Sequence, residues 1–368
     1  MSILFYCILI YFTVLLSYLI ILNLLSNKLK PDLSADIYKE KPFISIIIAA
    51  RNEEASIIDC LQAIENLSWP KDKFEVLIGN DQSSDGTVEK VLDFIKHKNN
   101  FKLFTIDKNL GLAKGKANVL AHLAKEAKAD FFFITDADIK VPTLWIQSLL
   151  SNYNEKIGIV SGATITKGTT LFHDCQSLDW VYGFGMIKVV SDHLIPVSAV
   201  GNNMMISRIA YESTGGYEKI PFSVTEDFQL FIETLKNGWK YKNLLSADNL
   251  AVSKPIESFF QLLVQRKRWM KGAVRVPLVL LVFLFLQALF LPIIIYAIYL
   301  FPILGLSLWF LKITLQQLFI AQSYTKIGEQ YPILKSIFAF EIYSTFLSFI
   351  VLILYFVPTK VKWKGREY

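Results

Sequence analysis

Three long segments of this chain carry almost no charged side chains, and they limit the folds that the chain can adopt. Residues 1–27 and 276–311 contain no charged side chain, and residues 336–357 contain one, Glu341. A helix needs about 20 mostly apolar residues to cross the hydrocarbon part of a bilayer. The sequence therefore predicts an N-terminal transmembrane anchor over residues 1–27 and a C-terminal transmembrane region of two or three helices over residues 276–357.

Basic residues beside these segments predict how the chain lies in the membrane. Lys28 and Lys30 follow the first segment, which is longer than a signal-peptide core and lacks a small-residue cleavage site, so an uncleaved anchor is expected. The positive-inside rule then places the next region in the cytoplasm. The basic tail 358–368 favours a cytoplasmic C-terminus, which needs an even number of later spans. Residues 276–311 can form a hairpin at Pro292 or Pro302, or one span plus an interfacial segment. A hairpin plus the last segment makes three spans, and the sequence leaves this conflict open.

The composition of the remaining chain narrows the class of protein. Residues 41–275 have mixed composition and are long enough for one large domain. The net charge of +6 comes largely from Lys and Arg near the apolar segments, so nucleic-acid binding is not expected. The three cysteines, Cys7, Cys60 and Cys175, are far apart, which argues against a disulfide framework or a zinc site. An integral membrane protein, in the cell membrane of a bacterium, with its mixed domain in the cytoplasm is therefore expected.

The first half of the mixed region alternates apolar, β-branched runs with helical patterns. The expected strands are 43–50, 74–78, 101–106 and 131–135, and the expected helices between them include 113–127. Continuous apolar strands that alternate with helices indicate a largely parallel α/β sheet with both faces covered. Ligands of such sheets bind at the carboxyl ends of the strands.

Charged side chains follow several of these expected strands. Arg51 follows the first strand, Asp81 the second, and Asp136 and Asp138 the fourth. Mg²⁺ and Mn²⁺ prefer carboxylate and phosphate oxygens, and a cation held by one or two carboxylates usually completes its shell with substrate phosphates. The sequence therefore predicts a divalent cation at Asp136 and Asp138, although an Asp-x-Asp alone also suits a polar turn.

The second half of the region has less regular patterns. We expect a strand over 157–165, an amphipathic helix over 171–190, and a turn at 201–205. Thr225-Glu226-Asp227 opens another helix, where a threonine cap followed by acidic residues would suit the helix dipole without any catalytic role. The segment 265–269 (Gln-Arg-Lys-Arg-Trp) lies just before the apolar block, where basic residues can simply contact lipid headgroups.

Taken together, these motifs resemble those of the family 2 glycosyltransferases, an inverting, membrane-associated group that includes cellulose, chitin and hyaluronan synthases and ceramide glucosyltransferase. The resemblance covers about residues 43–272. The matching segments are Ala49-Ala50-Arg51-Asn52-Glu53, Asn80-Asp81-Gln82-Ser83-Ser84-Asp85-Gly86-Thr87, Asp136-Ala137-Asp138, Thr225-Glu226-Asp227 and Gln265-x-x-Arg268-Trp269. It implies a GT-A domain, of the α/β class, flanked by transmembrane helices, and an enzyme that uses a nucleotide sugar, with UDP as the expected nucleotide.

The resemblance also implies a role for each matching residue. Asp227 would be the general base, and Asp138 with Asp136 would hold Mg²⁺ or Mn²⁺ on the diphosphate. The residues implied at the acceptor and the diphosphate are Glu226, Gln265, Arg268 and Trp269. The residues implied at the donor are Ala49, Arg51, Glu53, Asp81, Lys114, Lys116 and Asp136, where the duplicated lysine leaves open which of the two contacts the donor.

Several alternatives are weaker on the residues themselves. A processive polysaccharide synthase shares the Gln-x-x-Arg-Trp motif, but extrusion needs a polar path through the bilayer. Because Glu341 is the only acidic residue in the later apolar blocks, we expect a single transfer to a lipid or lipid-linked acceptor. A sugar nucleotidyltransferase usually carries a Gly-rich first loop, and residues 49–54 have no glycine. A non-enzymatic membrane scaffold would not need the acidic residues at strand and helix ends.

Overall fold

The computed structural model describes residues 2–32, 40–193, 195–332, 334–357, 362–363 and 366–367. Most of the expected basic tail, including Lys360 and Lys364, lies outside the described residues. The chain forms two compact units, which we call the sheet unit (Pro31–Ile165 and Ser198–Lys254) and the helical unit (Met1–Lys30, Thr166–Val197 and Pro255–Tyr368).

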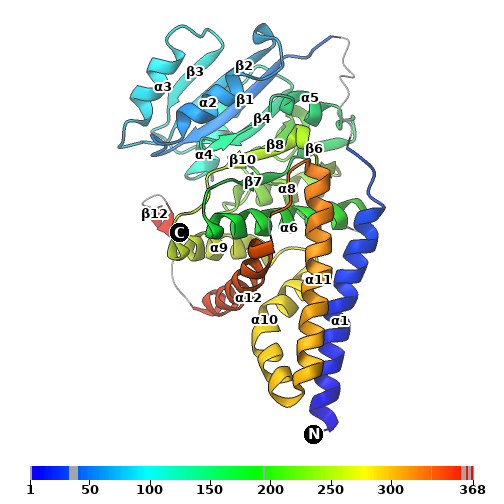
Figure 1. Cartoon of the computed structure of the whole chain (residues 1–368). Helices are drawn as coiled ribbons and strands as arrows, with labels where there is room; N and C mark the ends of the chain where they lie inside the picture. Colours follow the sequence, from blue (N-terminus) through cyan, green and yellow to red (C-terminus); the bar gives the residue numbers. More distant parts are fainter. Residues whose placement is uncertain are drawn as a thin grey trace. The chain divides into compact units, whose positions relative to one another are not determined.

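The sheet unit is built on a seven-stranded sheet with the order β3-β2-β1-β4-β8-β6-β9 (Figure 1). Its strands are β1 (Ile44–Ala50), β2 (Phe74–Asn80), β3 (Phe101–Thr105), β4 (Phe131–Asp136), β6 (Ile157–Ser161), β8 (Asn203–Ser207) and β9 (Lys240–Asn243). All neighbours pair in parallel except β8, which runs antiparallel to β4 and β6. The expectation of a largely parallel α/β sheet is confirmed.

Helices cover both faces of this sheet. They are α2 (Ile57–Glu65), α3 (Thr87–Ile95), α4 (Lys116–Glu126), α5 (Trp145–Leu150), α7 (Arg208–Ser213) and α8 (Glu226–Lys236), with short 3-10 turns at Lys71–Lys73 and Ala247–Asn249. Alternate residues of β1, such as Ile46 and Ile48, join one buried cluster with α2 and α5. A Cβ on Gly79 of β2 would come within 2.2 Å of Val119 on α4. Glycine at 79 therefore lets α4 pack directly on β2.

Three elements of the sheet unit differ from expectation. The run 157–165 divides into β6 and β7 (Thr164–Thr166), and β7 joins a second small sheet with β5 (Ile139–Lys140) and β10 (Ala251–Ser253). The stretch 201–205 is only partly a turn, because β8 begins at Asn203 and lies in the middle of the main sheet. The helix expected from residue 113 begins at Lys116, since Gly115 at its start has φ +56°.

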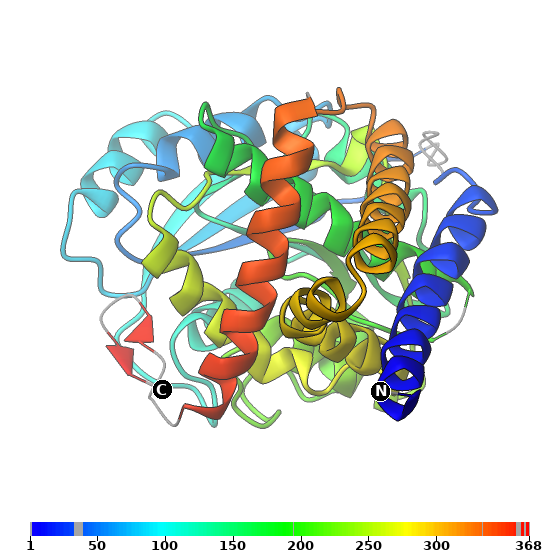
Figure 2. The ribbon, with the colours of Figure 1, turned by 60° about the horizontal axis from the view of Figure 1, so that its bottom comes forward.

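The helical unit contains α1 (Ser2–Asn27), α6 (Leu171–His193), α9 (Phe259–Ala273), α10 (Leu278–Leu300), α11 (Pro302–Ile327) and α12 (Leu334–Phe356), followed by β11 (Lys362–Trp363) and β12 (Arg366–Glu367). Among the described residues, four helices are long and apolar enough to cross a membrane: α1, α10, α11 and α12. Figures 1 and 2 show α1 alongside α11. The apolar block 276–311 forms the hairpin expected at Pro302, which begins α11, whereas Pro292 lies inside α10.

Glu341, the only acidic residue of the later apolar blocks, has a charged partner. Its carboxylate on α12 accepts hydrogen bonds from Lys312 Nζ at 2.7 Å and from Trp309 Nε1 at 2.9 Å, both on α11. Lys312 and Glu341 are only 1% and 2% exposed. The sequence pattern missed this pair because the uncharged block stops at residue 311, whereas α11 continues past Lys312 to Ile327.

We predict that this ion pair fixes α11 against α12. Changing Lys312→Met alone leaves the Glu341 carboxylate buried without its cation, which costs about 3–5 kcal/mol in comparable buried pairs. The double change Lys312→Met with Glu341→Leu removes both charges and should recover most of that loss. Thermal unfolding of detergent-purified protein measures both variants. If the single variant is as stable as the unchanged protein, the pair has no such role.

Candidate active site

The carboxyl ends of β1, β2 and β4 meet at one edge of the sheet. The register sets Ala49 of β1 opposite both Gly79 of β2 and Asp136 of β4. Beyond this level, the Arg51 Nη1 donates a hydrogen bond to the Asp81 carbonyl oxygen at 2.7 Å, and Asp81 is buried. The predicted donor residues Ala49, Arg51, Asp81 and Asp136 therefore lie at the same sheet edge, where parallel sheets bind ligands.

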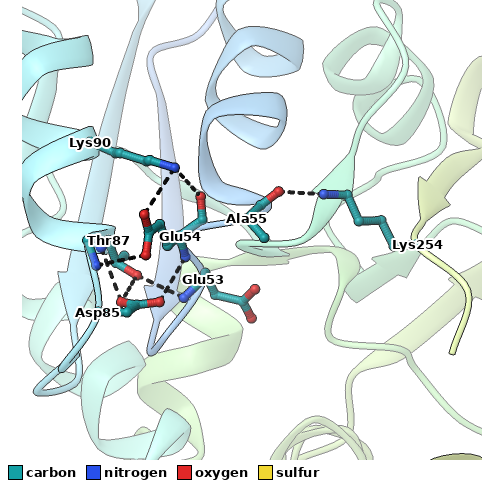
Figure 3. A network of polar contacts seen from close by, with 8 residues as sticks. Glu53, Glu54, Ala55, Asp85, Thr87, Lys90 and Lys254 are labelled. Carbon is teal, nitrogen blue, oxygen red and sulfur yellow. Dashed lines mark hydrogen bonds and ion pairs between the residues drawn. The ribbon is translucent and has the colours of Figure 1, made fainter. Parts of the chain in front are cut away.

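Reciprocal hydrogen bonds join the loops that follow β1 and β2 (Figure 3). The Glu53 amide donates to Thr87 Oγ1 at 2.8 Å, and the Glu54 amide donates to Asp85 Oδ2 at 3.1 Å. The Glu54 carboxylate lies 3.3 Å from Lys90 Nζ. Asn52 and Gln82 have positive φ angles of 52° and 56°, a conformation that non-glycine residues adopt rarely and often at functional sites. These contacts hold both loops in a fixed shape at the sheet edge.

Carboxylates gather around the buried thiol of Cys60 on α2. The thiol donates to the Asp136 carbonyl oxygen at 3.5 Å. Burial raises the pKa of Cys60, and the nearby charges of Asp138, Asp136 and Glu53 raise it further. The described residues contain no cluster of three or more His, Cys, Asp or Glu side chains arranged around one metal position. Asp136, the last residue of β4, and Asp138 just beyond it are both half-buried, and a pair of carboxylates can hold a hard cation that takes its other ligands from phosphates.

The structure distinguishes the two lysines of the loop before α4. Lys116 Nζ lies 2.6 Å from Asp136 Oδ1 and 2.8 Å from Glu226 Oε1. Burial would lower the pKa of Lys116, but the charges of Asp136, Glu226 and Asp227 outweigh burial and raise it. Lys114 instead lies over the ring of Phe222, with its Nζ 5.7 Å from the ring centre. Lys116 is thus the one that joins the acidic cluster.

Asp227 in the first turn of α8 is held by backbone groups. Its Oδ2 accepts from the Gly201 amide at 2.8 Å, and its Oδ1 accepts from the Phe228 amide at 2.8 Å. Thr225 stands at the N-cap without a side-chain hydrogen bond to the helix, and Glu226 and Asp227 lie in the first turn, where acidic residues suit the helix dipole. Burial and the charge of Glu226 raise the pKa of Asp227, against the opposing effects of Lys116 and these amides. A carboxylate with a raised pKa is a good proton acceptor.

A small pocket lies beside this acidic cluster, between α4, α8 and the loop that precedes α8. Its lining includes Tyr217, Phe222, Ser223, Glu226 and Gln229. It combines an aromatic ring and apolar side chains with hydroxyl, amide and carboxylate groups. The pocket is small, with room for about one water molecule.

The last predicted motif belongs to the helical unit. Gln265, Arg268 and Trp269 lie on α9, whereas the acidic residues described above lie in the sheet unit. The Trp269 ring contacts Arg266 on the same helix and Trp180 on α6. The centres of the two tryptophan rings are 5.5 Å apart.

Sequence reasoning missed the partner that holds Asp227. Gly201 looked like an ordinary turn glycine, yet a Cβ there would come within 2.7 Å of the Asp227 Cβ. The pair is 26 residues apart, so only the tertiary fold brings the two together. The only sequence pattern at this place is the run Gly201-Asn202-Asn203. It indicates a turn, but it does not show that the turn contacts Asp227.

Comparison with known proteins identifies the family of this chain. The family model described as glycosyl transferase family 21 matches residues 7–368. The chain belongs to glycosyltransferase family 21. It is therefore a glycosyltransferase, as the motifs predicted, although those motifs resembled family 2 in the first place. The family assignment decides against the nucleotidyltransferase and scaffold alternatives.

Individual relatives agree with this assignment. The chain is 31% identical over 244 residues to the probable glycosyltransferase YdaM of Bacillus subtilis, covering 64% of this chain and 56% of the relative. It is 24% identical over 244 residues to the beta-monoglucosyldiacylglycerol synthase of Synechocystis, covering 63% and 48%. It is 30% identical over 170 residues to the poly-beta-1,6-N-acetyl-D-glucosamine synthase of Staphylococcus epidermidis, covering 41% and 39%. The chain spans about half the length of these curated relatives.

A solved structure with the same fold supports the expected GT-A class. The mannosyltransferase PcManGT from Pyrobaculum calidifontis, in complex with GDP-Man and Mn²⁺, aligns with a TM-score of 0.59 at 16% identity. The alignment covers 95% of this chain and 99% of the mannosyltransferase. The expected fold, an α/β GT-A domain flanked by long apolar helices, is confirmed.

We predict that Gly201 is needed to hold Asp227. In Gly201→Ala the new methyl group must push the Asp227 side chain away, and a misplacement of about 1 Å can cost on the order of 100-fold in rate. We expect sugar transfer to slow by about 10- to 100-fold while the protein remains folded. Gly183→Ala on α6 is the matched control, because no atom lies within 4 Å of a Cβ there. Equal activity of both variants would contradict the prediction.

Proposed function

We propose that this protein is a membrane-embedded, inverting glycosyltransferase. It would transfer one sugar from a nucleoside diphosphate sugar, with UDP as the expected nucleotide, to a lipid or lipid-linked acceptor. The catalytic sheet unit would face the cytoplasm, where nucleotide sugars are supplied. Asp227 would be the general base, and the sheet edge with Ala49, Arg51, Glu53 and Asp81 would bind the donor nucleotide.

One observation carries this proposal: Lys116 joins Asp136 of β4 to Glu226 of α8, and Asp227 follows Glu226 directly. The side that binds the diphosphate and the side that accepts a proton are thus linked through a single lysine. Transfer from a nucleoside diphosphate sugar needs help of both kinds. The departing diphosphate gains charge that cations stabilise, and the attacking hydroxyl must lose a proton.

The geometry suits a single displacement. The Asp227 carboxylate is fixed by the Gly201 and Phe228 amides, so it can accept the acceptor's proton without reorienting. A single displacement needs only one base and inverts the anomeric carbon. Lys116, which contacts Asp136 and Glu226, would hold the diphosphate.

A divalent cation, Mg²⁺ or Mn²⁺, is part of the proposal. Asp138 and Asp136 would hold it, with Asp138 the more direct ligand because Asp136 Oδ1 already contacts Lys116. Such a cation stabilises charge on the leaving diphosphate. The mannosyltransferase of the same fold is described with Mn²⁺ and GDP-Man, which supports a metal-dependent reaction here.

The apolar helices support a lipid acceptor. A helix such as α10, which is uncharged over its whole length, would be in contact with lipid. The relative in Synechocystis is named as a synthase of a glucosylated diacylglycerol, whereas the relative in Staphylococcus epidermidis is named as a polysaccharide synthase. A single transfer would give a glycosylated lipid, whereas a processive reaction would give a long polysaccharide. Gln265, Arg268 and Trp269 of α9 would border the acceptor in either case.

The product distinguishes the two reactions. We expect purified protein, incubated with labelled UDP-glucose, UDP-N-acetylglucosamine or GDP-mannose and micelles of diacylglycerol, ceramide or polyprenyl phosphate, to form a short organic-soluble product. Excess chelator and the change Asp138→Ala should each abolish it, and added Mg²⁺ or Mn²⁺ should restore only the chelated sample. A water-soluble ladder of long chains would show a processive synthase instead. Full activity in excess chelator would show that the reaction does not need a divalent cation.

We predict that Asp227 sets the acidic limb of the pH profile. Its raised pKa means that the carboxylate gains its charge at a higher pH than an ordinary aspartate, so kcat/KM should rise with pH through that raised pKa. Asp227→Asn removes the proton acceptor and should lower kcat by about 10²–10⁴-fold. Donor binding, measured by calorimetry with UDP, should survive. The exposed Asp72→Asn is the control, and normal turnover of Asp227→Asn at saturation would make Asp227 a binding residue.

A further inference from the structure

We propose that Asp179 on α6 is a positioning residue for the acceptor side of the reaction, acting through Arg266 on Trp269. This inference rests on the proposed function, in which Trp269 borders the acceptor. Neither Asp179 nor Arg266 belongs to the Gln-x-x-Arg-Trp motif that suggested a role for this helix. All three residues lie in the helical unit, and their contacts are internal to it.

The first contact is an ion pair between two helices. Arg266 Nη2 on α9 lies 2.5 Å from Asp179 Oδ2 on α6. The two side chains are 15% and 23% exposed, so water screens the pair only in part. A charge-assisted hydrogen bond of this kind is shorter and stronger than one between neutral groups. The pair therefore fixes where the guanidinium group of Arg266 lies.

The second contact links that guanidinium to the motif tryptophan. Arg266 and Trp269 are three residues apart on α9, which places them on the same helix face. The Arg266 guanidinium carbon lies 4.3 Å from the centre of the Trp269 ring. At this distance a cation is attracted to the face of an indole, by about 0.5–2 kcal/mol depending on exposure.

The third contact holds the same ring from α6. Trp180, the neighbour of Asp179, approaches Trp269 edge-on with an angle of 74° between the ring planes. Trp269 is thus contacted by its own helix through Arg266 and by α6 through Trp180. We call this set, Asp179, Trp180, Arg266 and Trp269, the tryptophan clamp.

Polar atoms beside the clamp also favour a ligand at this face of α9. Gln265 Oε1 and Arg266 Nε are buried and have no hydrogen-bond partner among the residues that the structure describes. Buried polar groups in native proteins nearly always have a partner, which water or a ligand can provide here. Gln265 is itself a motif residue, which ties these atoms to the acceptor side.

The clamp depends on the charge of Asp179. Without that carboxylate, the largely buried Arg266 guanidinium would lose the ion pair with Asp179, which is costly. A long arginine side chain can swing toward water instead, and it would then leave the Trp269 ring. The motif tryptophan would lose its contact with Arg266, although the sheet unit, with the proposed base and donor residues, would be unchanged.

Enzyme kinetics of the full chain test this role. For Asp179→Asn we expect the KM for the lipid that the unchanged protein glycosylates to rise by about 2- to 30-fold, the equivalent of one cation–π contact. The donor KM, and the slow hydrolysis of the nucleotide sugar without lipid, should not change. Asp192→Asn is the matched control: it lies on the same helix and pairs with Lys188 at 2.8 Å. Equal changes in the donor and acceptor KM values would overturn the proposal.

A charge exchange separates positioning from simple packing. The double variant Asp179→Arg with Arg266→Asp can restore an ion pair between α6 and α9, but it leaves no cation on α9 over Trp269. We expect its melting temperature to recover while the acceptor KM stays high. If the exchange also restores the acceptor KM, the ion pair only packs the two helices, and the proposal is wrong.

A spectroscopic measurement keeps the test independent of the reaction. In protein labelled with 5-fluorotryptophan, the Trp269 resonance in a ¹⁹F NMR spectrum can be assigned from the variant Trp269→Phe. We expect Asp179→Asn to shift this resonance and Asp192→Asn to leave it in place. An unmoved resonance would refute the clamp. Failure of the unchanged protein to glycosylate any lipid would instead count against the proposed function, because the resonance does not depend on that activity.

Discussion

The acidic cluster of this enzyme depends on one half-buried lysine, Lys116. Asp136, Glu226 and Asp227 come from two elements that are far apart in the sequence, and like charges brought together in a largely buried site repel each other. Lys116 contacts the first two directly, and its charge opposes the increase in the pKa of the third. The three carboxylates in turn raise the pKa of Lys116 and keep it charged. Neither the lysine nor the carboxylates would be stable at this place without the other.

Backbone conformation decides that Lys116, and not Lys114, takes this position. Gly115 has φ +56° and ψ −132°, a region that residues with a Cβ rarely enter. The chain turns there and begins α4 at Lys116, while Lys114 lies before the turn over Phe222. The sequence shows the glycine between two lysines, but it does not show the direction of the turn. This is why the choice between the lysines needed the structure.

The fold was easier to predict than the site, for physical reasons. Apolar β-branched runs such as residues 44–50 form strands because both faces of the sheet are covered, and their ends set Asp81 and Asp136 at one edge whatever the details of the loops. By contrast, β8 was missed because Asn203 and two methionines do not form a β-branched run, although burial in the middle of the sheet stabilises them as a strand. The contact of Gly201 with Asp227 depends on tertiary packing, which a local pattern does not contain.

The polar residues of the apolar helices are relevant to the choice between single transfer and extrusion. Lys312 on α11 pairs with Glu341 on α12, and Asn23 Oδ1 on α1 accepts from Gln322 Nε2 on α11. Each of these contacts ties a polar group to another part of the protein. Interhelical hydrogen bonds of this kind hold helices together in lipid. A water-filled path for a polymer would need such groups to face the path instead. The pairs Lys312–Glu341 and Asn23–Gln322 therefore hold helices together, and the single transfer proposed above needs no other role for them.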